Sequence, residues 1–279
     1  MAEYVKDRAP TSAGLLLNRK TGSCGVCGQH RKLTKTHVPP QVAGNRGQVQ
    51  RADVMSSASS GFNPERWRIG GMWVLGLCGE CNSLAGARYD RAYADFADQL
   101  WSWLQTRTHL LLPGTPALTL APGRVSRSIL SGMLGISPNL REFHPTLAAQ
   151  VAAGGPVRLP GGLRLWFAAY PGNRTQLTGP MLTGLVDGSG RAINTLAAVT
   201  FRPLTWALAT SDSDAVMADQ GWTDATDWLR YEDERERHDL RWLVPRGLTL
   251  IRTILHAPSD DAVVLYSKEI APIMTGLIP

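Results

Sequence analysis

The chain has 279 residues, of which 43% are hydrophobic and 19% are charged. This composition predicts a globular protein with one large or two modest domains. No apolar stretch approaches the roughly 20 residues that a membrane-spanning helix needs, and no secretory signal is expected at the first residues. The formal net charge of +6 favours an anionic partner such as nucleic acid.

The positive charge lies mainly in the first part of the chain. Residues 1–105 contain 13 Lys and Arg against 8 Asp and Glu, whereas the remainder contains 16 against 15. Residues 1–22 read as a basic arm that could lie along a phosphate backbone. Charge alone fits a solvated basic surface equally well.

All four cysteines fall in two C-x-x-C pairs, Cys24-Gly-Val-Cys27 and Cys78-Gly-Glu-Cys81. Two thiolates at this spacing can turn toward one ion, and four complete the tetrahedron that Zn²⁺ prefers. The pattern therefore predicts a structural zinc site. A redox dithiol is the alternative for a single pair, but it explains the paired arrangement less well. Paired thiolates that bind a metal also favour a reducing, cytoplasmic location.

Strand-like and helical segments surround these pairs. We expect a hairpin over residues 24–37, a surface loop over residues 41–66, a strand over Met72–Leu77 and a helix from Ser83. Apolar residues at steps of three and four mark the buried face of that helix. They are Tyr89, Tyr93, Phe96, Leu100, Trp103 and Leu104.

The order of these motifs resembles the HNH endonucleases, which have a ββα-metal fold. The resemblance covers the first third of the chain. It is carried by the two cysteine pairs, by Leu33-Thr-Lys-Thr-His37-Val-Pro-Pro40, by Asn82 directly after the second pair, and by Gly86-Ala-Arg-Tyr-Asp90. It implies that His37 is a general base that activates water for hydrolysis of DNA, with a single Mg²⁺ or Mn²⁺ ion and a purely structural Zn²⁺.

The sequence departs from the family pattern at the catalytic metal site. Thr36 stands where a metal-binding carboxylate or His is common, and Asn82 stands where many members have His. Many members also have an Asn shortly before the second cysteine pair that supports the loop of the base. Trp73 occupies that place here, so this Asn is absent or displaced, with Asn63 as a distant candidate. The resemblance leaves Thr36, Asn82 and Asp90 as possible ligands of the catalytic ion, with Asn82 also a catalytic candidate.

Basic side chains near this segment are the expected contacts with DNA. They are Arg31, Lys32, Lys35 and Arg88.

The remaining residues, 111–279, read as a separate α+β domain with no catalytic motif. We expect a helix over residues 125–136, hairpins over 157–167 and 181–201, a strand over 204–209, a helix over 223–234 and a strand over 263–266. This region could mediate homodimerisation, DNA specificity or signal sensing.

The sequence thus predicts an α+β protein with a zinc-stapled ββα nuclease module at residues 23–110 and a C-terminal region rich in antiparallel strands. The function predicted first is a metal-dependent endonuclease that acts on DNA. A catalytically inert zinc-ribbon protein that binds DNA is the alternative, and Thr36 and the missing middle Asn support it.

Overall fold

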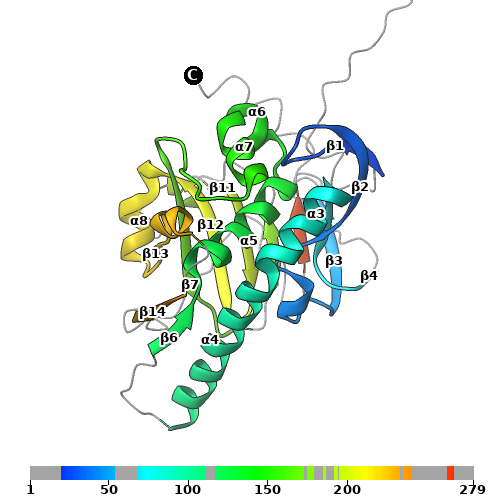
Figure 1. Cartoon of the computed structure of the whole chain (residues 1–279). Helices are drawn as coiled ribbons and strands as arrows, with labels where there is room; N and C mark the ends of the chain where they lie inside the picture. Colours follow the sequence, from blue (N-terminus) through cyan, green and yellow to red (C-terminus); the bar gives the residue numbers. More distant parts are fainter. Residues whose placement is uncertain are drawn as a thin grey trace, which may run out of the picture.

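The computed structural model describes residues 20–53, 68–110, 117–172, 175–178, 185–186, 192–193, 195–232, 235–239 and 263–266. Nearly all of the predicted basic arm, residues 1–22, and Asn63 lie outside these residues. The described chain combines helices with largely antiparallel sheets, in agreement with the predicted α+β class (Figure 1).

The described strands form one large sheet, one three-stranded sheet and two small ribbons. The large sheet has eight strands in the order β13-β7-β12-β11-β8-β15-β3-β4, and the three-stranded sheet has the order β1-β2-β5. The strand bounds are β1 (Thr21–Ser23), β2 (His30–His37), β3 (Gln48–Asp53), β4 (Arg68–Ile69), β5 (Trp73–Cys78), β6 (Ala117–Leu120), β7 (Leu163–Ala169), β8 (Gln176–Thr178), β9 (Leu185–Val186), β10 (Ala192–Ile193), β11 (Thr195–Phe201), β12 (Leu204–Thr210), β13 (Thr223–Asp224), β14 (Glu236–Asp239) and β15 (Val263–Tyr266).

The helix α5 lies at the centre of the structure, between the three-stranded sheet and the large sheet (Figure 1). Almost every residue of α5 is buried, because the helix has packing partners on all sides. The helices and helical turns are α3 (Gly79–Ala85), η2 (Gly86–Asp90), α4 (Arg91–Leu110), α5 (Pro122–Ile136), α6 (Asn139–Phe143), α7 (Pro145–Ala153), α8 (Asp214–Asp219), η1 (Gln41–Ala43), η3 (Ser211–Ser213) and η4 (Thr226–Arg230).

The N-terminal part contains two antiparallel strands followed directly by a helix. Strands β2 and β5 pair from Leu33 opposite Cys78 to His37 opposite Trp73. Every residue of β5 is buried, which explains why its sequence is a continuous apolar run. The predicted strand and hairpin are therefore confirmed, and the helix begins at Gly79 rather than at Ser83.

Two glycines allow α5 to approach this sheet closely. A Cβ atom on Gly25, in the first cysteine pair, would collide with the backbone carbonyl of Leu134, and one on Gly76 in β5 would collide with that of Gly135. The backbone of α5 therefore lies directly against the segments that carry the cysteines. Only glycine leaves space for such contacts.

One hydrophobic cluster joins the N-terminal strands, α4, α5 and the strands of the large sheet. The six apolar residues predicted for the inner face of the long helix are all buried, which confirms that face. Described residues on both sides of position 110 share this core. The division of the chain into domains at that position remains a prediction.

Three predictions about secondary structure were wrong. The expected loop at 41–66 contains the strand β3, which joins the large sheet through parallel pairing with β15. The expected hairpin at 157–167 contains only one strand, β7, which pairs with β12 and β13. The expected helix at 223–234 is instead β13 followed by the short turn η4. In these segments, pairing with strands far along the chain determines the secondary structure, and it overrides the preference of the local sequence pattern.

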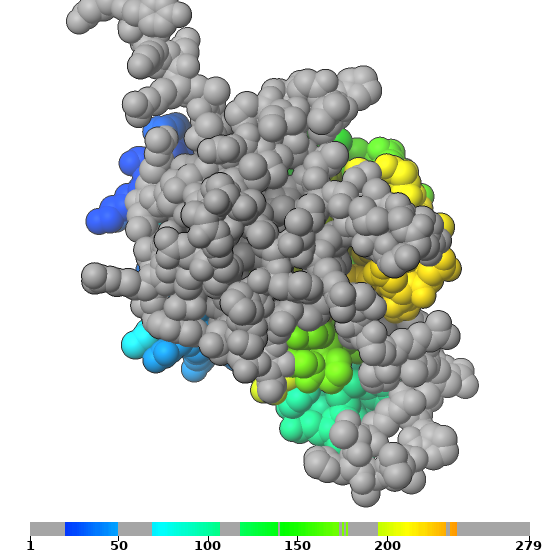
Figure 2. Space-filling view, turned by 180° about the vertical axis from the view of Figure 1, so that it is seen from behind, coloured from blue at the N-terminus to red at the C-terminus, as the bar shows by residue number. Residues whose placement is uncertain are grey.

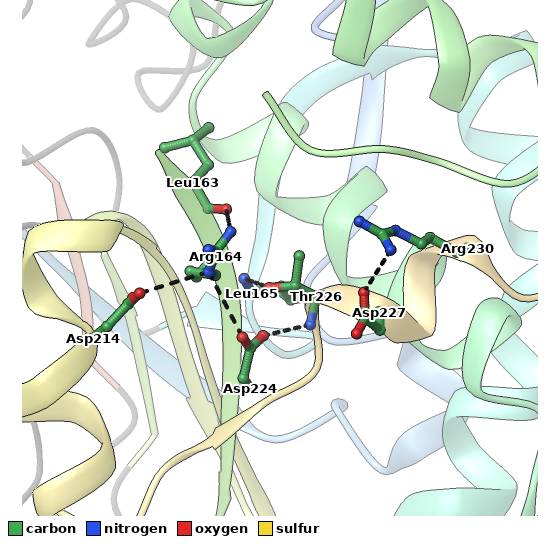
Figure 3. Close-up of polar contacts among 8 residues, drawn as sticks. All are labelled: Leu163, Arg164, Leu165, Asp214, Asp224, Thr226, Asp227 and Arg230. Atoms are coloured by element: carbon green, nitrogen blue, oxygen red, sulfur yellow. Dashed lines mark hydrogen bonds and ion pairs between the residues drawn. The ribbon is translucent and has the colours of Figure 1, made fainter. Parts of the chain in front are cut away.

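Polar contacts fasten the edge strand β13 and the helix α8 to β7 (Figure 3). The guanidinium Nε of Arg164 lies 3.6 Å from a carboxylate oxygen of Asp214 and 3.7 Å from one of Asp224. Burial raises the pKa of Asp214, although Arg164 opposes this effect. The Thr226 hydroxyl accepts a hydrogen bond from the Leu165 amide, which ties η4 to the same strand.

Among the described helices, none combines the length and the apolar character needed to cross a membrane.

Candidate metal centre and adjoining cavity

The four cysteines come together from two distant segments. Cys24 and Cys27 lie in the turn between β1 and β2, Cys78 ends β5, and Cys81 lies in the first turn of α3. Their sulfur atoms all lie within 4.8 Å of one another, and none is in a disulfide. These residues are close enough to bind one metal ion.

The spacing of the sulfurs fits zinc. The Sγ atoms of Cys27 and Cys78 lie 3.8 Å apart. Four sulfurs at about 2.3 Å from a central Zn²⁺ in a tetrahedron would be separated by about 3.8 Å. The Cys78 amide also donates a hydrogen bond to the sulfur of Cys24 at 3.3 Å, which would stabilise a thiolate there.

The protonation of the thiols depends on burial and on neighbouring hydrogen bonds. Burial raises the pKa of Cys27 and, more strongly, that of Cys81. Burial would also raise the pKa of Cys78, but hydrogen bonds from Cys81, including its backbone N–H, outweigh this effect and lower it. A cation that binds here therefore has to displace protons from at least two thiols.

His37 is half-buried at the end of β2, and its ring is held by a backbone carbonyl. Its Nε2 atom lies 2.9 Å from the carbonyl oxygen of Gly70. A carbonyl oxygen can only accept, so Nε2 carries the proton and Nδ1 of the neutral ring keeps a free lone pair. Burial lowers the pKa of His37 and outweighs the hydrogen bond to the Gly70 carbonyl, which raises it; the positive charge of Lys35 lowers it further. The neutral, basic form therefore prevails at neutral pH.

The sequence analysis missed one residue that supports this histidine. Asn45 is fully buried, and its Nδ2 donates to the carbonyls of Pro39 at 2.7 Å and Met72 at 2.9 Å. Its Oδ1 accepts from the Met72 amide at 2.6 Å. Asn45 thus joins the segment after His37 to the start of β5. It occupies a supporting position for which Asn63 was considered, and no local motif marks it.

A cavity of about 230 Å³ lies beside this histidine. Five of the predicted site residues line it, from β2, α3 and η2. They are Lys35, Thr36, His37, Asn82 and Asp90. Residues 128, 131 and 132 of α5 form another wall. The structure therefore brings the candidate base and all three candidate cation ligands to one cavity.

A π-helical turn helps to place Asn82 and Asp90 on the same wall. In a regular helix, eight residues separate their directions by about 80°. The segment η2 is a π-helix, whose turns hold more residues and therefore wind more slowly. Burial raises the pKa of Asp90, while a hydrogen bond from the Ser128 hydroxyl at 3.2 Å opposes this shift.

The oxygen atoms in the cavity suit a hard cation. Asn82 donates through Nδ2 to the Lys35 carbonyl at 3.1 Å, which leaves its Oδ1 as an acceptor. The Thr36 hydroxyl is buried and has no hydrogen-bond partner among the described residues. One carboxylate, one amide oxygen and one hydroxyl fit Mg²⁺, which usually keeps several waters.

The predicted DNA contacts are spread more widely. Lys35 lies at the cavity, where its ammonium sits 4.6 Å from the centre of the Trp73 ring. Arg31 instead forms an exposed ion pair with Glu80 at 2.8 Å. Lys32 is exposed on β2, and Arg88 is exposed beside Gly154 at the end of α7. Of these four residues, only Lys35 lines the cavity.

Comparisons of the chain with protein-family models, with curated protein sequences and with solved structures gave no match. What the site can do therefore follows from its own geometry.

Proposed function

We propose that the protein is a metal-dependent endonuclease of the HNH type, which hydrolyses phosphodiester bonds of DNA with His37 as the general base. One observation carries this proposal: a neutral histidine with a fixed tautomer lies in the same cavity as a carboxylate and an amide oxygen, and the amide belongs to Asn82, which directly follows Cys81 of the four-thiol cluster. The basic N-terminal part of the chain supports an anionic substrate.

His37 would remove the proton from the attacking water. The hydrogen bond from Nε2 to the Gly70 carbonyl aims Nδ1 away from that carbonyl, and the same bond stabilises the imidazolium formed when Nδ1 gains a proton. The lowered pKa keeps the ring neutral before each turnover. The nearby ammonium of Lys35 would attract the phosphate.

Asp90, Asn82 and Thr36 would hold the catalytic cation through their oxygen atoms. When bound, Mg²⁺ or Mn²⁺ stabilises negative charge on the phosphate and on the departing oxygen. The burial of Asp90 favours a bound cation, because a buried carboxylate gains more from a nearby positive charge than an exposed one. The zinc site would be structural, since four thiolates leave no open position.

The test is cleavage of plasmid DNA by the wild type and by His37→Ala, with Mg²⁺, Mn²⁺ or EDTA, alongside a zinc assay. We expect metal-dependent nicking by the wild type, its loss in His37→Ala, and one zinc per chain in both. His30→Ala is the matched control, because His30 is exposed at the other end of the same strand. Equal cleavage by His37→Ala and His30→Ala would refute the role of His37.

A zinc-ribbon protein that binds DNA without cleaving it is the second candidate. Asp90 is the only carboxylate among the described residues that line the cavity, which favours this reading. If the wild type binds DNA and zinc but cleaves under no metal condition, this candidate replaces the first.

A further inference from the structure

A second, larger cavity lies on the other side of η1. Its volume is about 410 Å³, within the range of small-molecule sites. Residues 43 and 44, α4 and the turn between β11 and β12 line it. On the face shown in Figure 2, the blue-green surface of α4 lies next to the light green surface of the chain near residue 175.

The walls of this cavity combine aromatic rings with one positive and one negative side chain. Trp101 and Phe201 supply the rings, Arg202 the positive charge and Asp98 the negative charge. The guanidinium carbon of Arg202 lies 4.2 Å from the centre of the Trp101 ring. This contact holds a planar cation against an aromatic face, an arrangement on which planar bases stack.

The cavity is separated from the site of His37 by a single short turn. Residues 40–42 line the first cavity, and residues 43 and 44 line the second. Val42 and Ala43 are neighbours in the chain, so the two cavities are about one residue apart along this wall. The next residue after Gly44 is Asn45, which is bonded to the segment that follows His37.

We propose that this second cavity binds one nucleotide unit, with its base stacked on the Arg202 and Trp101 pair. The N–H groups of Arg202 would bind the phosphate, because a guanidinium matches phosphate oxygens with paired donors. The carboxylate of Asp98 would accept from an amino group on the edge of the base. The proposal rests on the proposed nuclease function for its ligand class and extends it.

The charges limit how the nucleotide lies. Asp98 repels phosphate, so the phosphate has to lie at the N–H edge of Arg202, while the base stacks on the guanidinium face with its amino edge toward Asp98. Two sources could supply such a unit, a nucleotide of the DNA strand next to the scissile bond or a free mononucleotide. The chemistry that recognises the base and the phosphate is the same for both.

The test is isothermal titration calorimetry of full-length His37→Ala protein, which prevents cleavage during the measurement. The probes are the four deoxynucleoside monophosphates, a short single-stranded oligonucleotide and inorganic phosphate. Arg202→Gln should weaken binding of the nucleotide probes by about tenfold or more, since it removes charged hydrogen bonds. Arg202→Lys should also weaken it, because the charge remains but the planar stacking face is lost.

The matched control is Arg91→Gln, which removes an equal charge from α4, the helix that carries Trp101. The Arg91 side chain is 83% exposed and does not line the cavity. Zinc content and thermal unfolding confirm that each variant is folded. Binding of mononucleotides would assign the cavity to a free ligand, and binding of the oligonucleotide alone would assign it to the DNA strand. The proposal is overturned if no nucleotide binds more tightly than phosphate, or if Arg202→Gln and Arg91→Gln bind equally.

These outcomes separate the two proposals. Binding that depends on Arg202, in a protein whose wild type shows no cleavage that depends on His37, keeps the nucleotide site and removes the nuclease. Cleavage that depends on His37, without binding that depends on Arg202, does the reverse.

Discussion

Replacing Asn45 by alanine should weaken both the fold and the site. The side chain of Asn45 is fully buried and makes three hydrogen bonds, two to Met72 and one to Pro39. The Met72 carbonyl keeps a second donor, the Val38 amide at 3.1 Å. The substitution therefore leaves two groups without the hydrogen bond that Asn45 provides, the Met72 amide and the Pro39 carbonyl. Both groups lie next to the buried side chain of Asn45.

Each buried group that loses its partner costs about 1–3 kcal/mol, so the loss of two partners in Asn45→Ala should lower the free energy of unfolding by about 2–6 kcal/mol. For a chain of this size, about 1 kcal/mol shifts the melting temperature by roughly 2 °C. We therefore expect Tm to fall by roughly 4–12 °C. The rate of DNA cleavage should fall even at temperatures where the variant remains folded, because Pro39 and Met72 flank the segment that positions His37.

The assay is thermal and urea unfolding at fixed zinc concentration, with cleavage measured well below Tm. Arg46→Ala is the control, because Arg46 is the next residue and its side chain is exposed. It should stay within about 0.5 kcal/mol of the wild type. If Asn45→Ala unfolds with the same free energy as Arg46→Ala, the hydrogen bonds of Asn45 do not stabilise this segment and the reasoning is wrong.

Three further predictions concern single residues. In the pH dependence of DNA cleavage, the midpoint of the acidic limb should lie below the ordinary His pKa of about 6.5. Burial lowers the pKa of His37, and only the neutral ring accepts a proton. A midpoint above about 6.5 would contradict this prediction. Gly76→Ala should destabilise by about 1–3 kcal/mol in urea unfolding, because its Cβ would meet the backbone of α5. Gly79→Ala should cost little, since its Cβ would make only ordinary contact. Arg127→Met should lower the unfolding free energy by about 2–4 kcal/mol, because buried Arg127 donates to the Tyr231 carbonyl at 2.7 Å.

The sequence predicted those parts of the site that depend on residues only a few positions apart in the chain. Two residues between paired cysteines fix each half of the thiol cluster, and the apolar run before Cys78 predicts the strand that brings the halves together. The steps of three and four residues after Tyr89 likewise predicted the buried face of the long helix. In each case the information lies within a few residues of chain.

The parts that the sequence did not predict depend on contacts between distant residues. Asn45 lies 27 residues from Met72, and nothing near it in sequence marks it as buried. Residues 41–66 are rich in Gly, Ser, Ala and Asn and therefore predict a loop; the strand β3 forms there because it pairs with β15, which lies more than 200 residues later. The π-helical turn η2, which ends at Asp90, has no sequence signal either, because its residues fit a regular helix.

The hydrophobic core that the N-terminal strands share with the large sheet reduces the part of the stability that a bound zinc ion would have to supply. A small ββα unit alone would need the metal to replace a missing core. Here the cysteine segments pack against α5 and belong to the same hydrophobic cluster as the large sheet. A zinc ion bound by the four cysteines would therefore have to fix only the two cysteine segments relative to each other, and its removal should loosen the site without unfolding the sheet.

Cys27→Ser tests this inference by hydrogen exchange. Amide protection should fall in β2, which follows the first cysteine pair, and in α3, which contains Cys81, while β11 and β12 keep the protection of the wild type. Cleavage should be lost together with zinc, because His37 ends β2 and Asn82 lies in α3. Equal loss of amide protection in β12 and in β2 would contradict this inference. It would show that the metal stabilises the whole fold and that the two cysteine segments unfold together with the large sheet.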